Sequence, residues 1–321
     1  MRAWHLIRQG ALALAGLCLM ASPQAAEKRC LYVSSYHAGY EWNDGIERGM
    51  DRVLQGHCEL RRFYMDTKRH PEPAWAEARA VEALALIDDF RPDVLLAADD
   101  NASRYLVMPY FRDATLPVVF SGLNWTVSEY AYPYRNATGM VEVAPIQPLI
   151  RQVRRILPST RRVLFLAADV STERKDYGYY RKIFSRLGVQ LDARLVKSFA
   201  EWQQAYRDGQ AYDVILFNNN AGIAGWDPAA ASQFVLDEGG VLSVSVYAWM
   251  TPYVALAIAK VPEEQGDWMA RVALGILDGL SPADVPIIPN RRWDVWVNRD
   301  IVQRHGLELP HSLALKAKAY P

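Results

Sequence analysis

The sequence predicts an α/β protein with two Rossmann-like lobes, each built on a parallel sheet that is doubly wound by helices. Short apolar runs alternate with stretches of helical periodicity along most of the chain, which is the pattern of parallel sheets. The alternation pauses near residues 138–143 and then begins again, so two sheets of similar size are expected. Many apolar runs end in polar or aromatic residues, and ligands bind at such strand ends in open α/β sheets.

The first 26 residues are expected to form a signal peptide and to belong to neither lobe. Arg2 and Arg8 precede the apolar run 11–20, and mostly small residues fill positions 22–26, which is the order of a cleavable secretory signal. A retained membrane anchor is the alternative, although this run has only about half the ~20 residues that span a bilayer. The mature protein is therefore expected in the periplasm.

Charge and motif content exclude several functional classes. The chain carries 36 basic and 36 acidic residues and no Lys/Arg-rich tract, so no nucleic-acid partner is expected. It contains no Gly-x-Ser-x-Gly elbow, phosphate-cradling loop, His-Glu-x-x-His or Cys-x-x-Cys motif, and its histidines are scattered without ligand spacing. We therefore expect no metal, no cofactor and no enzymatic activity.

Residues 27–140 are expected to form the first lobe. After an apolar strand at residues 30–34, Ile46 and Met50 lie four residues apart with charges on the opposite face, which predicts an amphipathic helix. The remaining elements are strand 58–64, helix 74–90, strand 93–98, a helix that reaches residue 110, and strand 117–120.

Residues 141–264 are expected to form the second lobe, and part of the tail, residues 265–321, to return to the first. The second lobe should contain helix 145–157, strand 162–168, a helix that ends at Gly188, and strands 189–198, 213–217 and 240–246. The tail should contain helix 265–278, strand 293–297 and a final short helix. Three segments are expected to cross between the lobes as a hinge: residues 138–143, 247–253 and 289–297.

Cys30 and Cys58 each open a strand-like run of the first lobe. If the two strands are parallel neighbours, the cysteines lie side by side at the same end of the sheet. In an oxidising compartment this placement favours a disulfide, which would stabilise the fold by about 3.5 kcal/mol on the chain-entropy model. Two unlinked buried thiols are the alternative.

Strand ends in both lobes supply the candidate ligand-binding residues. Aromatic rings there can stack on a planar ligand while neighbouring hydroxyl, imidazole, carboxylate and amide groups form hydrogen bonds. The alternative is that the aromatics simply pack and that the polar residues cap helices or turns. The candidates are Ser35, Tyr36, His37, Tyr40, Trp42, Asp66, Asp99, Asp100, Ser121, Asn124 and Trp125 in the first lobe, and Asp169, Ser171, Asn218, Asn219, Asn220, Tyr247 and Trp249 in the second.

Several passages carry a resemblance to a known family. The most specific is residues 275–286, followed by Val297-Asn298, 306–310, 312–313, 116–120 and 138–139. These passages resemble the ABC-transporter substrate-binding protein family, which has the type I periplasmic binding-protein fold, over essentially the whole mature chain. The loop at residues 35–42, with its Ser-Tyr-His-x-Gly-Tyr-x-Trp pattern, resembles a branch often associated with signalling proteins.

The resemblance implies a protein that captures a small polar or aromatic molecule between two lobes and presents it to the membrane permease of an ABC importer. Members that bind amino acids tend to carry Thr-Asp-Asn where this chain has Asn218-Asn219-Asn220. Asp99 or Asp100 is therefore expected to meet any cationic group. One alternative is a receptor that serves the periplasmic domain of a membrane sensor kinase or cyclase, and another is an exported α/β enzyme.

Overall fold

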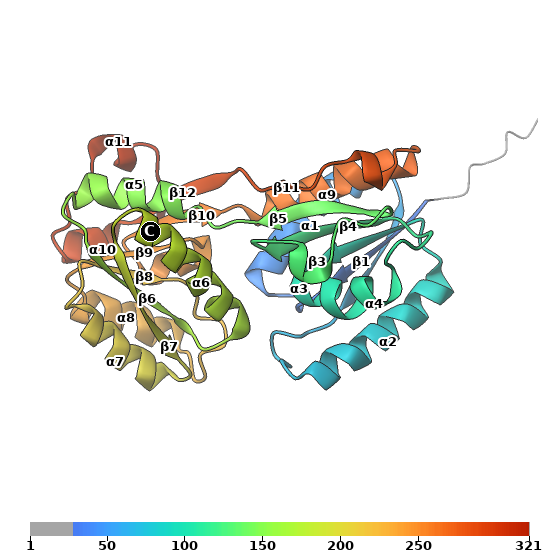
Figure 1. Cartoon of the computed structure of the whole chain (residues 1–321). Coiled ribbons are helices and arrows are strands. Elements are labelled where there is room, and N and C mark those ends of the chain that lie inside the picture. The colour runs from blue at the N-terminus through green and yellow to red at the C-terminus, as the bar shows by residue number, and fades with distance from the viewer. Residues whose placement is uncertain (1–27, 321) are drawn as a thin grey trace, which may run out of the picture.

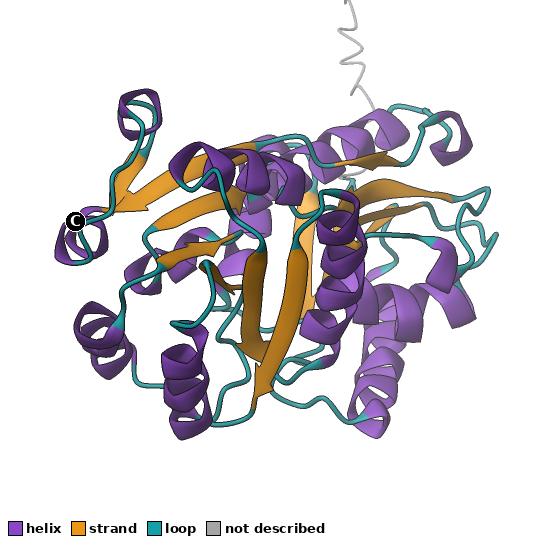
Figure 2. Ribbon diagram, turned by 60° about the vertical axis from the view of Figure 1, so that its left-hand side comes forward, coloured by secondary structure: helices purple, strands orange, loops and turns teal. Residues whose placement is uncertain are grey.

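The protein consists of two lobes, each centred on its own sheet (Figure 1). The structure, a computed structural model, describes residues 28–320, so the predicted signal peptide lies outside the described residues. Helices flank the strands on both sides, as Figure 2 shows. The predicted fold class is confirmed. Among the described residues, no helix is both long enough and apolar enough to cross a membrane.

The first lobe contains a six-stranded sheet. Its elements are β1 (Arg29–Ser34), α1 (Glu41–Leu54), β2 (Glu59–Tyr64), α2 (Pro73–Phe90), β3 (Val94–Ala98), α3 (Asp99–Asn101), the π-helix η1 (Ala102–Val107), α4 (Met108–Tyr110), β4 (Val118–Asn124), η2 (Ser128–Tyr130), β5 (Ala137–Glu142) and, from the tail, β11 (Ile288–Pro289). The strand order is β11-β5-β4-β3-β1-β2, and each neighbouring pair is parallel. The central strands β3 and β4 are buried along their whole length, as apolar runs covered on both faces should be.

The second lobe contains a seven-stranded sheet. Its elements are α5 (Ile146–Ile156), β6 (Arg162–Ala168), α6 (Ser171–Arg186), β7 (Gln190–Val196), α7 (Phe199–Gly209), β8 (Val214–Phe217), α8 (Pro228–Glu238), β9 (Leu242–Ser245), η3 (Ala248–Tyr253), β10 (Leu256–Lys260), β12 (Trp293–Asn298), α10 (Arg299–Arg304), α11 (His311–Ala314) and β13 (Lys318–Tyr320). The strand order is β13-β12-β10-β9-β8-β6-β7, and β12 runs antiparallel to β10.

The tail contributes to both lobes. Helix α9 (Pro262–Leu277) lies along α1 of the first lobe, whereas β12 and β13 extend the sheet of the second. Two glycines permit the close approach of the helices. A Cβ atom at Gly266 would collide with the carbonyl oxygen of Ile46, and one at Gly49 with that of Glu263. Larger side chains at these two positions would therefore push α9 off the first lobe.

Three segments cross between the lobes, after Glu142, after Lys260 and after Pro289. The crossings predicted at residues 138–143 and 289–297 overlap the first and third of these. The crossing predicted at residues 247–253 is wrong, because η3 joins β9 to β10 within one sheet. Strand β10 is fully buried but short and contains two alanines, a residue type that strands disfavour, so the sequence gives little sign of it.

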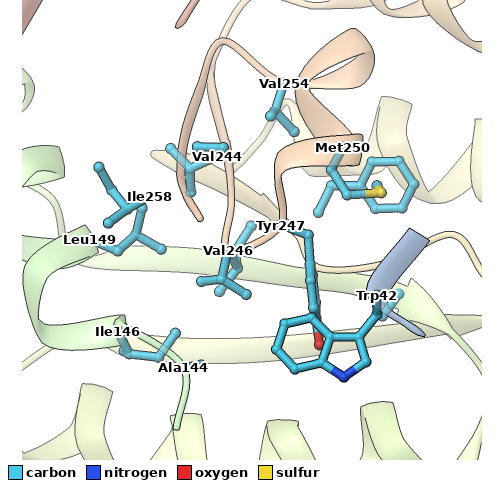
Figure 3. Packing of buried hydrophobic residues seen from close by; sticks show 14 of the residues in the cluster. Trp42, Ala144, Ile146, Leu149, Val244, Val246, Tyr247, Met250, Val254 and Ile258 are labelled. Atoms are coloured by element: carbon cyan, nitrogen blue, oxygen red, sulfur yellow. The ribbon is translucent and has the colours of Figure 1, made fainter. Parts of the chain in front are cut away.

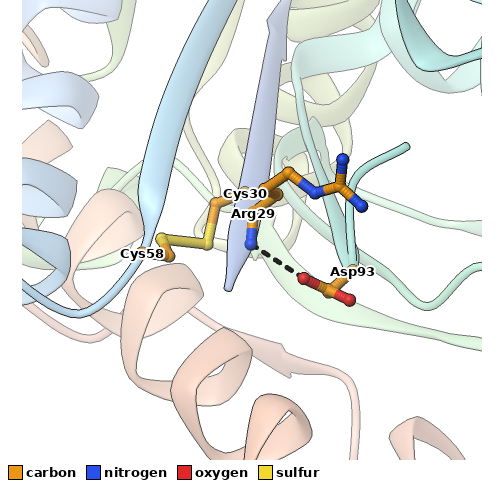
Figure 4. Close-up of a disulfide and its surroundings, with 4 residues drawn as sticks. All are labelled: Arg29, Cys30, Cys58 and Asp93. Atoms are coloured by element: carbon orange, nitrogen blue, oxygen red, sulfur yellow. Dashed lines mark hydrogen bonds between the residues drawn. A yellow bond between two sulfur atoms is a disulfide. The ribbon is translucent and has the colours of Figure 1, made fainter. Parts of the chain in front are cut away.

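Cys30 and Cys58 form a disulfide, as predicted (Figure 4). Cys30 lies in β1, and Cys58 directly precedes β2, the parallel neighbour of β1. A hydrogen bond also holds this end of the sheet, because the backbone N–H of Arg29 donates to Asp93 Oδ2 at 2.8 Å. The disulfide and this hydrogen bond together fix the start of β1, the strand that leads into the loop at residues 35–42.

The largest apolar cluster runs through both lobes without a break. It joins Trp42 and Ile46 of α1 to Val246, Tyr247 and Ile258 of the second lobe. Figure 3 shows Trp42 beside Tyr247 within this cluster. The two lobes therefore pack against each other in this structure and are not merely tethered.

Candidate functional site

A small chamber lies between the two lobes at the ends of their strands. The space is about 20 Å³, slightly more than one water molecule requires, so the lobes are closed on each other here. The lining residues are Tyr36, Tyr40, Trp42, Lys68, Asp99, Asn124 and Glu142 from the first lobe, and Thr172, Glu173, Asn219 and Tyr247 from the second.

Aromatic rings from opposite lobes meet at the chamber. The rings of Trp42 and Tyr247 are edge-to-face with centroids 6.5 Å apart, and those of Tyr40 and Trp249 meet in the same way at 6.2 Å. Tyr36 adds a third ring from the first lobe, edge-to-face with Tyr40 at 5.3 Å. Rings in these arrangements attract one another modestly and can also hold a planar ligand between them.

Asp99 is the most unusual side chain of the chamber. It directly follows β3 in a left-handed conformation, with φ of 68°, and it is 1% exposed. The indole N–H of Trp42 donates to its Oδ1 at 3.1 Å, but its buried Oδ2 has no hydrogen-bond partner. Burial, followed by the charges of Glu142 and Asp100, raises the pKa of the Asp99 carboxyl well above its ordinary value.

Gly122 makes room for this carboxylate. Its φ is +71°, and a Cβ atom there would lie 2.6 Å from Asp99 Oδ1. A side chain at this position of β4 would therefore displace Asp99 from the chamber.

The second lobe supplies further acidic groups from the first turns of α6. Asn218 Nδ2 donates to Glu173 Oε2 at 2.6 Å and to Asp176 Oδ2 at 3.1 Å. Burial, and then the neighbouring Asp176, raises the pKa of Glu173 to about 7. Beside Glu173, the hydroxyl oxygen of Thr172 is buried and has no hydrogen-bond partner. Two polar atoms on opposite walls of the chamber, Thr172 Oγ1 and Asp99 Oδ2, thus lack partners among the described residues.

A buried ion pair lies where two of the crossing segments begin. Lys260, the last residue of β10, pairs with Glu142, the last residue of β5, and both side chains are almost fully buried. The Lys260 ammonium also lies 4.0 Å from the centroid of the Tyr247 ring. Burial raises the pKa of Glu142, and Lys260 offsets part of that shift. This pair therefore ties the first crossing to the second directly behind the chamber.

Lys68 brings a cation to the opposite side of the chamber. Its ammonium lies 5.0 Å from the ring centroid of Tyr36 and 5.2 Å from that of Tyr40. Burial disfavours its charge, but Tyr40 and Glu173 outweigh burial and raise the pKa of Lys68. Lys68 also lines an open groove of about 680 Å³ that continues outward between the lobes.

Contacts along this outer groove hold the lobes together. The indole N–H of Trp125 donates to Asp176 Oδ1 at 2.7 Å, and its ring stacks on Tyr179 at 4.7 Å. Lys175 forms ion pairs with Asp100 at 3.4 Å and with Glu129 at 3.0 Å. Each of these contacts joins α6 of the second lobe to the first lobe, so α6 is the main element of the closed interface.

The structure brings together some of the predicted site residues and separates others. Tyr36, Tyr40, Trp42, Asp99, Asn124, Asn219 and Tyr247 line the chamber, while Asp100, Asp169 and Ser171 line the outer groove. Trp125 bridges the lobes beside that groove, and Trp249 packs on Tyr40 and Tyr247. The others are not at the chamber: Ser35, His37, Asp66, Ser121, Asn218 and Asn220.

The residues outside the chamber have local roles. The Ser35 hydroxyl donates to the carbonyl of Ala98 and accepts from the N–H of Ala102, so it fixes the start of η1. His37 lies 3.4 Å from Asp66, which forms a bidentate pair with Arg69. Asn218 orients Glu173 and Asp176 from behind. Ser121 is buried in β4, and Asn220 lies in the turn before Ile223.

Sequence reasoning missed Lys68, Glu142, Thr172 and Glu173 as chamber residues. Glu142 carried a usable signal, because a carboxylate that ends a buried strand needs a partner. The other three lie in helix or loop contexts where a charged or hydroxyl residue is ordinary, and only the fold directs them inward. Within residues 28–320, no group of three or more His, Cys, Asp or Glu side chains is arranged to hold a metal ion.

Comparison with known structures supports the fold. A conserved domain protein from Vibrio cholerae O1 biovar eltor matches with a TM-score of 0.71 at 15% identity, covering 91% of this chain and 99% of that one. An ABC domain from Streptococcus pneumoniae, solved in complex with L-Trp, gives 0.71 at 14% identity over 92% and 99%. A periplasmic ribose ABC transporter protein from Conexibacter woesei gives 0.57 at 14% identity over 88% and 96%. The fold is that of type I periplasmic binding proteins.

The sequence comparison identifies the family. No curated protein sequence matches the chain. The sequence profile described as ABC transporter substrate binding protein matches residues 74–320, which is most of the chain and includes α6, the crossing segments and the tail. The match begins after the loop at residues 35–42, so the assignment of that loop to a branch stays a prediction. The chain belongs to the family of ABC transporter substrate-binding proteins.

Proposed function

We propose that the protein is exported to the periplasm, where it binds a small, partly planar molecule with several polar groups between its lobes. The ligand occupies the chamber between Trp42 and Tyr247, and the closed protein presents it to the permease of an ABC importer. The ligand is released chemically unchanged. The similar Streptococcus domain was solved with L-Trp, which supports a planar molecule as a ligand for this architecture.

One observation carries the proposal, namely a pair of buried, unpartnered polar atoms on two residues that line the chamber from opposite lobes. Asp99 Oδ2 belongs to the first lobe and Thr172 Oγ1 to the second. Each buried polar group that lacks a partner costs about 1–3 kcal/mol. A ligand that hydrogen-bonds to both atoms removes both costs only when the lobes are closed, so ligand binding and closure are coupled.

Closure of this kind needs a hinge that bends without letting the lobes separate. Three crossing segments, after β5, β10 and β11, provide such a hinge. The chamber holds about 20 Å³ when closed, so a ligand must enter while the lobes are open and enlarge the chamber as it binds. The shift toward the closed form is set by the difference in ligand affinity between the two forms.

The test begins with the molecule that the protein retains. Protein purified from the periplasm is denatured, and the released molecule is identified by mass spectrometry. Adding it back at 100 times its Kd should stabilise the ligand-free protein by ~2.7 kcal/mol. It should also reduce the radius of gyration in solution scattering. An unchanged radius at saturation would contradict hinge closure, and a chemically altered molecule would instead indicate an enzyme.

Two substitutions locate the site. Trp42→Ala and Asn219→Ala should each weaken binding of the identified molecule, because their side chains line the chamber from opposite lobes. Trp293→Ala is the matched control, since Trp293 is 47% exposed on the far strand β12. Unchanged affinity in both chamber variants would place the site elsewhere.

Uptake of the identified molecule by living cells tests whether the membrane partner is an ABC importer. Deletion of the gene should abolish uptake if the protein serves an importer. Normal uptake together with a lost transcriptional or cyclic-nucleotide response would favour the sensor alternative.

A further inference from the structure

The side chains of the chamber indicate which charge the ligand carries. We infer that the ligand is a cation, with an ammonium or guanidinium group that binds between Asp99 and the rings of Tyr36 and Tyr40, and that it needs no carboxylate. This inference rests on the proposed function and narrows its ligand class.

Asp99 is the anionic anchor for this group. Its Oδ1 already accepts a hydrogen bond from Trp42, and its Oδ2 is buried at the chamber without a partner. A cation beside the Asp99 carboxyl favours its ionised form, whose oxygens only accept hydrogen bonds, so a cationic donor supplies the missing partner of Oδ2. A cationic donor binds it more strongly than a neutral one, since charge-assisted hydrogen bonds are roughly twice as strong.

The neighbouring rings already hold a cation. The Lys68 ammonium lies 5.0 Å from the centroid of Tyr36 and 5.2 Å from that of Tyr40, within the range of a cation–π interaction. No carboxylate among the described residues lies within ion-pair distance of this ammonium. Lys68 follows Thr67 in the loop after β2 and lines both the chamber and the outer groove. It can therefore swing into the groove when a ligand cation takes its place over the rings.

The charges of the chamber also favour a cation. Its lining contains three carboxylates, those of Asp99, Glu142 and Glu173, against the single ammonium of Lys68. Lys260 neutralises Glu142 from behind, which leaves the carboxyl groups of Asp99 and Glu173 facing one ammonium. A ligand with one positive charge favours ionisation of both carboxyl groups and balances the set once they are ionised, whereas a ligand carboxylate would add negative charge.

A charge series on one ring system tests the inference. Tryptamine, L-tryptophan and indole-3-propionate share the indole ring and differ in being a cation, a zwitterion and an anion, and spermidine serves as a cation without a ring. Isothermal titration calorimetry of the ligand-free full-length protein gives the four affinities. Tryptamine or spermidine should bind, and tryptamine should bind at least about tenfold more tightly than L-tryptophan, the equivalent of ~1.4 kcal/mol.

Two variants and a control assign the roles of the residues. Asp99→Asn should weaken the binding of the cation about 10- to 100-fold, as expected for the loss of a hydrogen bond to a charged group. Asp66→Asn is the matched control, because Asp66 also follows a strand, has φ of 56° and lies outside the chamber. Lys68→Met should strengthen binding of the cation, since the competing ammonium is gone. Thermal unfolding of each variant confirms that it is folded.

Each other outcome overturns the inference. Tighter binding of L-tryptophan or indole-3-propionate than of tryptamine would show that the site selects a carboxylate, and Lys68→Met would then weaken binding. Failure of both cations to bind would also refute it, as would a retained native molecule that is neutral or anionic. In these cases the proposed receptor function still stands if the bound molecule depends on Trp42 and drives closure, so the two failures are distinguishable.

Discussion

The buried pair of Glu142 and Lys260 gives the sharpest prediction about stability. In the variant Lys260→Met the Glu142 carboxylate stays buried, at 5% side-chain exposure, and loses its only ion-pair partner among the described residues. Removal of one member of a buried pair costs about 3–5 kcal/mol. The burial that already raises the pKa of Glu142 acts unopposed in this variant. Glu142 therefore becomes protonated more readily, and the cost should be smaller at pH 5 than at pH 8.

The double variant Glu142→Gln, Lys260→Met separates the interaction energy of the pair from the effect of each single substitution. With both charges of the pair removed, its free energy of unfolding should lie within about 2 kcal/mol of the wild type. The two single substitutions should therefore be strongly non-additive, with an interaction energy of about 2 kcal/mol or more. Urea unfolding curves of the four proteins at pH 8 give this value.

An exposed pair on the same sheet is the matched control. Lys318 pairs with Asp294 at 2.6 Å, with side-chain exposures of 54% and 36%. Lys318→Met should cost less than about 1 kcal/mol, since surface pairs contribute little. If Lys260→Met costs no more than this control, or if the two substitutions at the buried pair are additive, the pair does not connect the crossing segments as described.

Three further predictions concern closure, pH and the disulfide. Trp125→Ala removes the hydrogen bond to Asp176 and the ring stacking at the outer groove, so it should disfavour the closed form by about 2 kcal/mol or more. The ligand-free variant should then show a larger radius of gyration than the wild type. Burial raises the pKa of Glu173 in the folded state to about 7, above the ordinary value of 4.5, so its contribution to stability falls as pH rises through this window, by up to about 3 kcal/mol. Glu173→Gln should accordingly match the wild type at pH 4 and exceed it at pH 8, and equal pH slopes would contradict this. Replacing both Cys30 and Cys58 with alanine should lower the free energy of unfolding by about 3.5 kcal/mol relative to the oxidised wild type. Denaturant unfolding of the variant, the oxidised wild type and the reduced wild type measures this difference.

The fold was predictable because its signals are local and repeated. Apolar runs such as residues 94–98 and 162–168 are buried strands in the structure, and the polar ends of those strands lie toward the space between the lobes. Strand β10 escaped prediction, and with it the true second crossing after Lys260. Its two alanines lie in a buried strand, but alanine is also common in helices. The local sequence therefore does not show which of the two structures this segment forms.

The site was predictable only in its general position. Tyr36, Trp42 and Asp99 follow strands, and the fold places them at the chamber. Asn218 follows a strand in the same way, but it turns inward to hold Glu173 and Asp176. Which side chains at the end of a strand face the cleft depends on how the other lobe packs against them. No local pattern in a single sequence encodes this packing.

The chamber itself is tested most directly by a crystal structure of the protein with the molecule that it retains on purification. We expect density for a small molecule enclosed between Trp42 and Tyr247, with a donor group of that molecule within hydrogen-bond distance of Asp99 Oδ2. A molecule bound elsewhere, with the lobes closed and this chamber no larger than about 20 Å³, would contradict it.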